Sequence, residues 1–282
     1  MSKLTDLICY KDGGYSPLLE SGPSLMDFGF IHSDATYDVM TIKNGKFFLS
    51  DLHLDRFQSS AGFYGLKVPE STEILDICRQ VCEINNISDG FVWLISWRGT
   101  PSDGNPRNFS DCPHHFVVYA KPYYNFNSSN SARVALYKDH VRVPDECFGQ
   151  QYKNFAWQDL TLAQRYAHHR GYDTAILCNH HGNITEGPGF AVGFVINNIV
   201  TIPNKDVLHS VTMSCLKQIC SNHQIFVAER NISWQESLLC DGMFLASTSG
   251  GFIPVIEYED RKLPHHKIIQ ILQDEYRLLQ NS

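Results

Sequence analysis

The sequence predicts an α+β fold, and three observations carry that prediction. Short apolar runs of strand length are mixed with segments of helical spacing, without a strict strand–helix–strand alternation. Hydrophobic residues make up 43% of the 282 residues, which is enough for a substantial core. A polar segment that begins near residue 121 interrupts the pattern and divides the chain. We therefore expect a small N-terminal α/β domain and a larger C-terminal α+β domain.

The N-terminal part starts with a strong hairpin signal. Asn44-Gly45 separates two apolar runs within residues 40–49, and both residue types accept the positive φ of a tight turn. Apolar residues then recur at helical spacing from Leu54 to Tyr64. The remaining elements expected in this part are a helix over 71–84 and buried strands over 91–97 and 115–120.

The composition changes at residues 121–132, where Pro, Asn and Ser accumulate and no apolar periodicity remains. Such a composition is typical of an exposed linker. We therefore expect domains over 1–120 and 133–282, joined by a linker over 121–132.

The C-terminal part contains one recognisable helix start. Ser233 and Glu236 have the spacing of a capping box, in which each side chain bonds the other's backbone N–H. A last helix is indicated by an apolar stripe of Ile268, Ile269, Leu272, Tyr276 and Leu279. The other expected elements are strands over 133–138, 174–179, 190–197, 199–202, 242–246 and 253–257, and helices over 155–170 and 211–221.

Charge and cysteine usage exclude several classes of protein. The net charge of −7 argues against a nucleic-acid binder and against a polybasic membrane binder. No apolar run approaches the length of a membrane span, and the N-terminus lacks a signal-peptide pattern. Nine cysteines without a C-x-x-C pair predict reduced thiols and a cytoplasmic protein. Adjacent histidines diverge in direction, so no metal site is expected.

Four separated groups of residues carry the functional information. They are FIHSDATYDV (30–39) followed by DLHLDRF (51–57); YKNFAW (152–157); NITEGPGF (183–190); and VLHSVT (207–212) paired with STSGGFIPV (247–255).

In order and spacing, these segments resemble the class IV aminotransferases, the fold-type IV enzymes that use pyridoxal 5′-phosphate (PLP). The resemblance covers about residues 28–258. Within the family, the segments HSDATYDV, KNFAW and STSGG look closest to the (R)-selective amine transaminases. The resemblance implies PLP as cofactor and a homodimer in which the second copy completes the substrate pocket.

The resemblance assigns cofactor roles to residues that would otherwise be unremarkable. Lys153 would hold the PLP aldehyde covalently, Glu186 would keep the pyridine nitrogen protonated, and Arg56 would bind the phosphate. Without the resemblance they would be interpreted as a surface lysine, a turn glutamate and an exposed helical arginine. The remaining phosphate donors would be Val211 and Thr212 at a helix N-terminus, and Thr248 in a turn.

The local setting of Lys153 offers a small independent argument. A helix beginning near Phe155 would place the ammonium group at a helix N-terminus, where a positive charge is unfavourable. That position, together with burial against Phe155 and Trp157, would lower the pKa of Lys153. A lysine that loses its proton readily is suited to nucleophilic work.

The substrate residues are expected on a strand and in loops. His32, Tyr37 and Val39 are expected on one strand, with Tyr37 and Val39 on the same face. By resemblance this segment lines the pocket, to which the turn residue Ser249 also contributes. Arg107, in the loop 100–108, is a candidate partner for a substrate carboxylate.

Three positions depart from the family pattern. Ser210 stands where glycine is usual, Met213 where an arginine opens the helix, and Phe190-Ala191 where Ser or Asn follows the glycine turn. These positions would border the reacting face of the cofactor, so they bear on the choice of substrate.

The leading hypothesis is a PLP-dependent aminotransferase that moves an amino group between an amine or amino acid and a keto acid. The donor would be an (R)-amine, a D-amino acid or a branched-chain L-amino acid. One alternative is an aminodeoxychorismate lyase, which eliminates pyruvate with the same cofactor. Another is an inactive binding or scaffold protein that retains the fold.

Overall fold

The computed structural model describes residues 4–123 and 131–281. These form two compact units, of which the first runs to residue 123 and also includes Tyr152–Ala156, while the second holds the remainder. Lys153, which the sequence division put in the second domain, is therefore grouped with the first unit. Of the expected linker 121–132, residues 124–130 lie outside the described residues, whereas residues 121–122 and 132 belong to strands.

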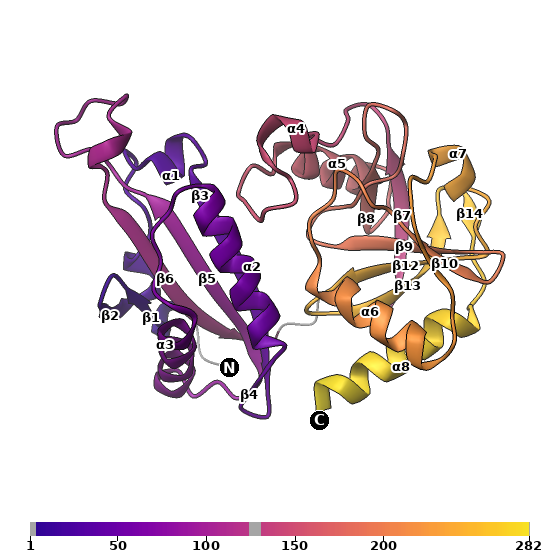
Figure 1. The fold of residues 1–282 in the computed structure, drawn as a ribbon, viewed down its shortest axis with the longest axis horizontal. Helices are drawn as coiled ribbons and strands as arrows, with labels where there is room; N and C mark the ends of the chain where they lie inside the picture. The colour runs from indigo at the N-terminus through magenta and orange to yellow at the C-terminus, as the bar shows by residue number, and fades with distance from the viewer. Residues whose placement is uncertain (1–3, 124–130, 282) are drawn as a thin grey trace. The chain divides into compact units, whose positions relative to one another are not determined.

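The first unit is built on a six-stranded sheet with the order β2-β1-β6-β5-β3-β4, in which every neighbouring pair is antiparallel (Figure 1). Its strands are β1 (Ile8–Lys11), β2 (Gly14–Pro17), β3 (Ala35–Lys43), β4 (Lys46–Phe48), β5 (Gly90–Arg98) and β6 (His114–Pro122). The predicted hairpin is confirmed, because β3 and β4 pair across Asn44 and Gly45, whose φ angles are 49° and 75°.

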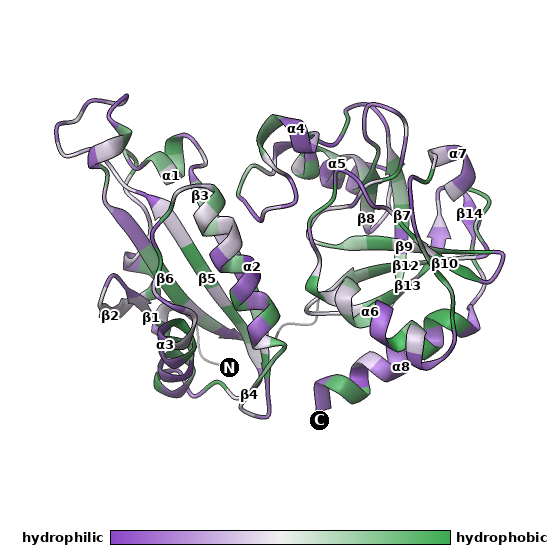
Figure 2. Ribbon diagram, viewed as in Figure 1, coloured by the Kyte–Doolittle hydropathy of each residue, from purple (hydrophilic) through white to green (hydrophobic). Residues whose placement is uncertain are grey.

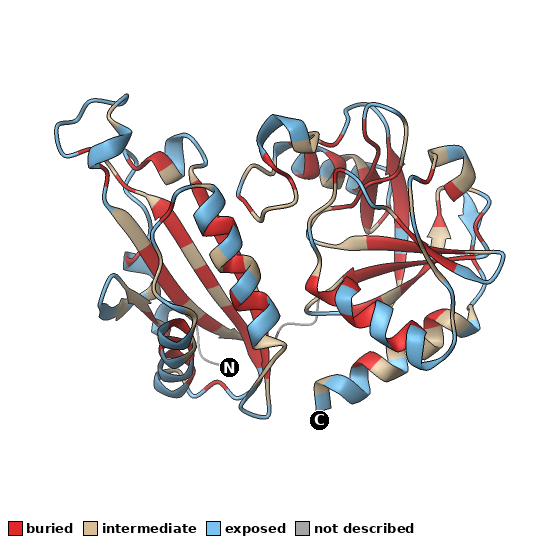
Figure 3. Ribbon diagram, in the orientation of Figure 1, coloured by how far each residue is buried: buried red, intermediate tan, exposed pale blue. Residues whose placement is uncertain are grey.

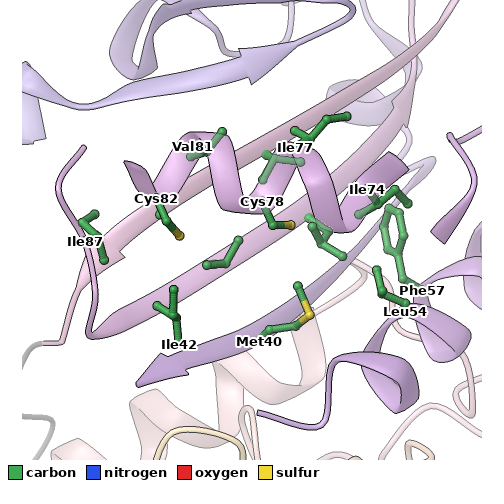
Figure 4. Close-up of a cluster of buried hydrophobic side chains, with 14 of the residues drawn as sticks. Met40, Ile42, Leu54, Phe57, Ile74, Ile77, Cys78, Val81, Cys82 and Ile87 are labelled. Atoms are coloured by element: carbon green, nitrogen blue, oxygen red, sulfur yellow. The ribbon is translucent and has the colours of Figure 1, made fainter. Parts of the chain in front are cut away.

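Two long helices cover one face of this sheet. The helices of the unit are α1 (Phe28–Ile31), α2 (Ser50–Phe63) and α3 (Ser71–Ile84), with short 3-10 turns η1 (Leu4–Asp6), η2 (Leu18–Glu20) and η3 (Phe109–Asp111). Figure 4 shows Ile74, Cys78 and Val81 of α3 directed at the strands, with Met40 among them. α3 has the predicted bounds, which an apolar stripe at helical spacing fixes.

Buried residues of α2 form two adjacent stripes, and Figure 3 shows buried and exposed positions alternating along the helix. Leu54, Phe57 and Ala61 make the apolar stripe expected from the sequence. Beside them, His53 and Ser60 are fully buried although they are polar. Arg56 lies between these two at the same spacing, so α2 presents a polar edge of three residues to its own unit.

The second unit contains an eight-stranded mixed sheet with the path β11-β10-β9-β12-β13-β7-β8, and β14 pairs with β13. The pairs β10–β11, β13–β7 and β7–β8 are parallel, and the others are antiparallel. The strands are β7 (Ala132–Tyr137), β8 (Thr174–Leu177), β9 (Ala191–Ile196), β10 (Ile199–Ile202), β11 (Val227–Glu229), β12 (Gly242–Ser247), β13 (Gly251–Tyr258) and β14 (Arg261–Lys262). The mixture of helices and strands confirms the α+β class.

The helices of the second unit are α4 (Asp145–Phe148), α5 (Gln158–His169), α6 (Val211–Asn222), α7 (Trp234–Ser237) and α8 (Lys267–Asn281). The capping prediction is confirmed, because the Ser233 side chain accepts a hydrogen bond from the Glu236 N–H at 3.1 Å. Figure 2 shows hydrophobic and hydrophilic segments alternating along α8. Ile269, Leu272 and Tyr276 are buried as expected, but Leu279 is exposed, since it lies near the C-terminal end of the helix.

Candidate active site

The backbone of Lys153 is held at both of its hydrogen-bonding groups by side chains of the first unit. Its N–H donates to Ser60 Oγ of α2 at 3.1 Å, and its carbonyl accepts from Thr36 Oγ1 of β3 at 2.6 Å. The half-buried side chain reaches over Tyr37, where Nζ lies 4.4 Å from the ring centroid. The main chain of a lysine on a short irregular segment is thereby fixed to two regular elements, α2 and β3.

The residues after Lys153 explain why the expected helix starts later. Asn154 Oδ1 accepts from the N–H of Ala156 at 2.9 Å, which closes a local turn. Asn154 Nδ2 also donates to Tyr64 Oη at 3.1 Å. α5 consequently begins at Gln158 rather than 155. Lys153 therefore does not lie at the N-terminus of a helix, contrary to the expectation, and the helix dipole acts only within the first turn.

Arg56 is largely covered, with 11% of its side chain exposed, contrary to the interpretation of an exposed helical arginine. Its Nε and Nη2 donate to Asp38 Oδ2 and Oδ1 at 2.7 and 2.8 Å, so one edge of the guanidinium is held by both oxygens. His53 Nδ1 lies 2.7 Å from Asp38 Oδ1. Burial would lower the pKa of Arg56, but the adjacent Asp38 charge outweighs it and raises that pKa.

The expected substrate residues of the first unit fall in different settings. Tyr37 and Val39 do lie on one face of β3, and the Tyr37 ring stacks on Trp93 with centroids 5.5 Å apart. His32 is not on that strand, because it follows α1 as its exposed C-terminal cap. Arg107 is exposed in the loop between β5 and β6.

In the second unit, Glu186 is buried rather than solvated. Its Oε1 accepts from Arg142 Nε and Nη2 at 3.0 and 2.9 Å, and its Oε2 accepts from the N–H of Leu208 at 3.2 Å. Two backbone bonds to Leu177 of β8 fix the segment that carries it: the Leu177 N–H donates to the Glu186 carbonyl, and the Leu177 carbonyl accepts from the N–H of Thr185. The next residue must be glycine, because a Cβ at Gly187 would lie 2.5 Å from the backbone carbonyl oxygen of Ala175.

Arg142 connects Glu186 to two further buried groups. Its Nη1 donates to Asp159 Oδ2 at 2.6 Å, and its Nη2 also donates to Gln150 Oε1 at 2.6 Å. Burial would lower the pKa of Arg142, but Glu186 and Asp159 raise it. With one guanidinium facing two carboxylates, the cluster carries one net negative charge when all three are ionised. No motif in the sequence points to Arg142, Asp159 or Gln150 as members of this cluster.

The expected phosphate donors of the second unit lie in two turns. Val211 and Thr212 are buried in the first turn of α6. The backbone N–H groups of a first turn have no acceptor within the helix, so they can bind an anion. Ser210 caps this helix by accepting from the N–H of Met213 at 3.3 Å, which gives the departure from glycine a structural role. Thr248 is half-buried and Ser249 exposed in the turn between β12 and β13.

The part of the chain that the structure describes contains neither a candidate metal site nor a disulfide. Across 4–123 and 131–281, no group of three or more His, Cys, Asp or Glu is arranged to hold a metal ion. All nine cysteines are free thiols, eight of them buried. Of the helices in the same ranges, none is both long and apolar enough to cross a membrane.

Comparison with known families shows which family the chain belongs to. Residues 35–258 match the model of the family described as amino-transferase class IV. The chain belongs to this family. Membership confirms the prediction of a PLP-dependent aminotransferase, whereas the (R)-selective subtype is a finer question.

Relatives of this class IV aminotransferase extend over most of its length. A Methanocaldococcus jannaschii protein, named provisionally as a branched-chain-amino-acid aminotransferase, is 23% identical over 266 residues, covering 93% of this chain and 91% of that protein. A Staphylococcus aureus D-alanine aminotransferase is 24% identical over 266 residues, covering 92% of each.

Solved structures confirm the fold-type IV architecture of the class IV aminotransferase. The branched-chain aminotransferase of Thermoproteus uzoniensis, solved with norvaline, has a TM-score of 0.89 at 20% identity and covers 98% of this chain and 95% of that one. Another branched-chain amino acid aminotransferase, complexed with N-(5′-phosphopyridoxyl)-L-glutamate, has a TM-score of 0.88 at 18% identity and covers 99% and 96%.

The residues of this aminotransferase fit the chemistry of PLP. A carboxylate offers about four acceptor positions, and Glu186 uses three of them on Arg142 and Leu208. Glu186 Oε2 therefore retains room for one more donor, such as a protonated ring nitrogen. The net negative charge of the Arg142 cluster favours a cation at that point.

Proposed function

We propose that this enzyme transfers an amino group from an (R)-configured amine or D-amino acid to a keto acid, with PLP held covalently by Lys153. The observation that carries the proposal is the fixed backbone of Lys153, whose N–H and carbonyl are bonded to Ser60 and Thr36. A lysine held in this way can lose and regain its covalent partner without its main chain moving. Such restraint is what repeated capture and release of a cofactor needs.

In this proposal, the aldehyde, the ring nitrogen and the phosphate of the cofactor are each bound by particular residues. When bound, PLP supplies an aldehyde that takes up the donor's amine and an electron-poor ring that stabilises charge at the donor carbon. Lys153 Nζ then carries the proton between the donor carbon and the cofactor carbon. Glu186 keeps the ring nitrogen protonated. Arg56, with Val211, Thr212 and Thr248, binds the phosphate.

The proposed configuration of the donor has two supports. The segment HSDATYDV resembles the (R)-selective amine transaminases, and D-alanine, named in several relatives, is itself an (R)-configured amine. Tyr37 and Val39 would line the pocket, since both lie on the face of β3 over which Lys153 Nζ extends. Ser249, His32 and the loop residue Arg107 remain candidates for contacts with the substrate, the last for its carboxylate.

The oligomeric state and the cellular location of the enzyme are also part of this proposal. We infer a homodimer, as in the enzymes whose motifs the chain shares. Free thiols at all nine cysteines support a reducing, cytoplasmic location. Sedimentation of the purified protein at several concentrations would test the dimer, and a monomer throughout would contradict it.

The test is a half-reaction followed by absorbance. The PLP-loaded enzyme is mixed with D-alanine, L-leucine or either enantiomer of a small chiral amine, without a keto acid. Conversion to pyridoxamine phosphate by the (R)-configured donors supports the proposal, and exclusive reaction with L-leucine contradicts the configuration. Pyruvate release from aminodeoxychorismate without an acceptor would favour the lyase instead. Failure to bind PLP at all would favour a scaffold protein.

Lys153→Ala is expected to abolish the half-reaction because the covalent anchor and proton carrier are lost. The matched control is Lys121→Ala, which removes another half-buried lysine whose Nζ lies over an aromatic ring, 5.4 Å from the Trp93 centroid. The control should react at the wild-type rate. Wild-type rates in Lys153→Ala would refute the assignment of the lysine.

A further inference from the structure

Asp38 is a buried charge in an unexpected place. It lies on β3 on the helix-covered face, two residues from Met40 in the apolar core, and its side chain is 0% exposed. An ionised carboxylate in such a position is costly unless several donors compensate it. A buried acid that a fold tolerates at this cost calls for an explanation beyond packing.

The donors around Asp38 are arranged to fix one guanidinium. Arg56 donates to both carboxylate oxygens from the Nε and Nη2 edge of its fork, at 2.7 and 2.8 Å. Oδ1 additionally lies 2.7 Å from His53 Nδ1 and accepts from the N–H of Val39 at 2.7 Å. The carboxylate is thus held by strand and helix, and its two bonds to Arg56 set the plane of the guanidinium.

We propose that Asp38, supported by His53, is a positioning residue that orients Arg56 for the phosphate of PLP. The proposal rests on the proposed function, in which Arg56 binds that phosphate. Asp38 holds the Nε and Nη2 edge through both of its oxygens, and this fixes the orientation in which Arg56 would meet the phosphate. The long arginine side chain is already ordered before the cofactor arrives, so less conformational freedom is lost on binding.

A purely structural role for the Asp38–Arg56 pair makes the opposite prediction. If Asp38 only neutralised Arg56, removing its charge would leave a more positive guanidinium and strengthen phosphate binding. If Asp38 orients Arg56, removing it weakens phosphate binding although the local charge becomes more favourable. The sign of the change therefore separates the two roles.

The experiment compares PLP with pyridoxal, which lacks the phosphate. Dissociation constants of both are measured on the full-length apoenzyme for wild type, Asp38→Asn, Arg56→Ala and the double variant. We expect Asp38→Asn to reduce the preference for PLP over pyridoxal by about tenfold or more, the scale of one charge-assisted hydrogen bond. Binding of pyridoxal should stay within about twofold, and the double variant should lose no more than Arg56→Ala.

The matched control is Asp34→Asn, which removes another carboxylate paired with an arginine of the same unit, Arg98 at 2.6 Å. Its preference for PLP should equal that of wild type. An unchanged or increased preference in Asp38→Asn overturns the inference, as does an equal loss for both ligands. If Asp38→Asn does not fold, Asp38→Glu retains the charge but displaces the fork, and the same loss is expected.

Failure of the underlying function gives a different result. Wild-type protein that binds neither PLP nor pyridoxal overturns both the function and the inference. Wild-type protein that binds PLP through Lys153, with a preference that Arg56→Ala leaves intact, overturns the inference and the assignment of Arg56 to the phosphate, but leaves the PLP-dependent transfer standing.

Discussion

Each unit buries an arginine against carboxylates, but the two clusters differ in net charge. In the first unit, Arg56 faces the single carboxylate of Asp38, so the pair is neutral overall. In the second unit, Arg142 faces both Glu186 and Asp159, which leaves one negative charge in excess. The same kind of ion pair therefore serves two different purposes in the two units. A neutral pair can orient a guanidinium toward an anion, whereas an anionic triad can hold a carboxylate ready for a cation.

The largest expected effect comes from removing the excess charge. Glu186→Gln keeps the shape of the side chain but makes the second cluster neutral, so the ring nitrogen would no longer be held protonated. We expect kcat to fall about 10³-fold, the scale of losing one preorganised electrostatic contact. Steady-state rates with saturating PLP provide the measurement.

Glu236→Gln is the matched control for that change, because Glu236 pairs with Arg230 on the surface of the same unit. It should leave kcat unchanged. A Glu186→Gln enzyme with wild-type kcat would show that the anionic cluster has no part in the reaction.

The second effect tests how the anionic triad is stabilised. Arg142→Met leaves Glu186 and Asp159 buried without their counter-charge, so the free energy of unfolding should fall by about 3–5 kcal/mol at neutral pH. Urea unfolding measures it. Arg170→Met, which breaks a more exposed pair with Glu259, should cost less than about 1 kcal/mol. Equal losses in the two variants would contradict the buried triad.

The smallest effect concerns pH and the neutral pair. Burial would raise the pKa of Asp38, but Arg56 and His53 outweigh it and hold that pKa below its ordinary value of 3.8. A lowered pKa stabilises the fold at pH values above the ordinary pKa, and this contribution is lost as the pH falls further. The difference in unfolding free energy between wild type and Asp38→Asn should therefore shrink below about pH 4. A difference that grows in acid would contradict the ion pair.

Local signals in the sequence predicted local structure well. The Asn44-Gly45 hairpin, the Ser233 cap and helix α3 each depend on residues a few positions apart, and the structure confirms them. The predicted start of α5 was wrong for an equally local reason. Asn154 Oδ1 accepts from the N–H of Ala156, and this turn makes the helix begin later than predicted. His32 was misplaced because the short helix α1 precedes β3.

The charge clusters could not be predicted in the same way. Arg142 is 44 residues from Glu186 and 17 from Asp159, so no spacing in the sequence connects them. The resemblance to the family singled out Lys153, Arg56 and Glu186 as candidates, but not the buried groups that hold the last two. One signal was available on α2, where His53, Arg56 and Ser60 recur at helical spacing beside an apolar stripe.

The most direct test of the account is to find which residue carries the cofactor. The PLP-loaded enzyme is reduced with borohydride, digested, and its phosphopyridoxyl peptide identified by mass spectrometry. The account predicts a single modified site at Lys153, with none in Lys153→Ala and an unchanged site in Lys121→Ala. Modification of another lysine in the wild-type protein, or of no lysine at all, would contradict it.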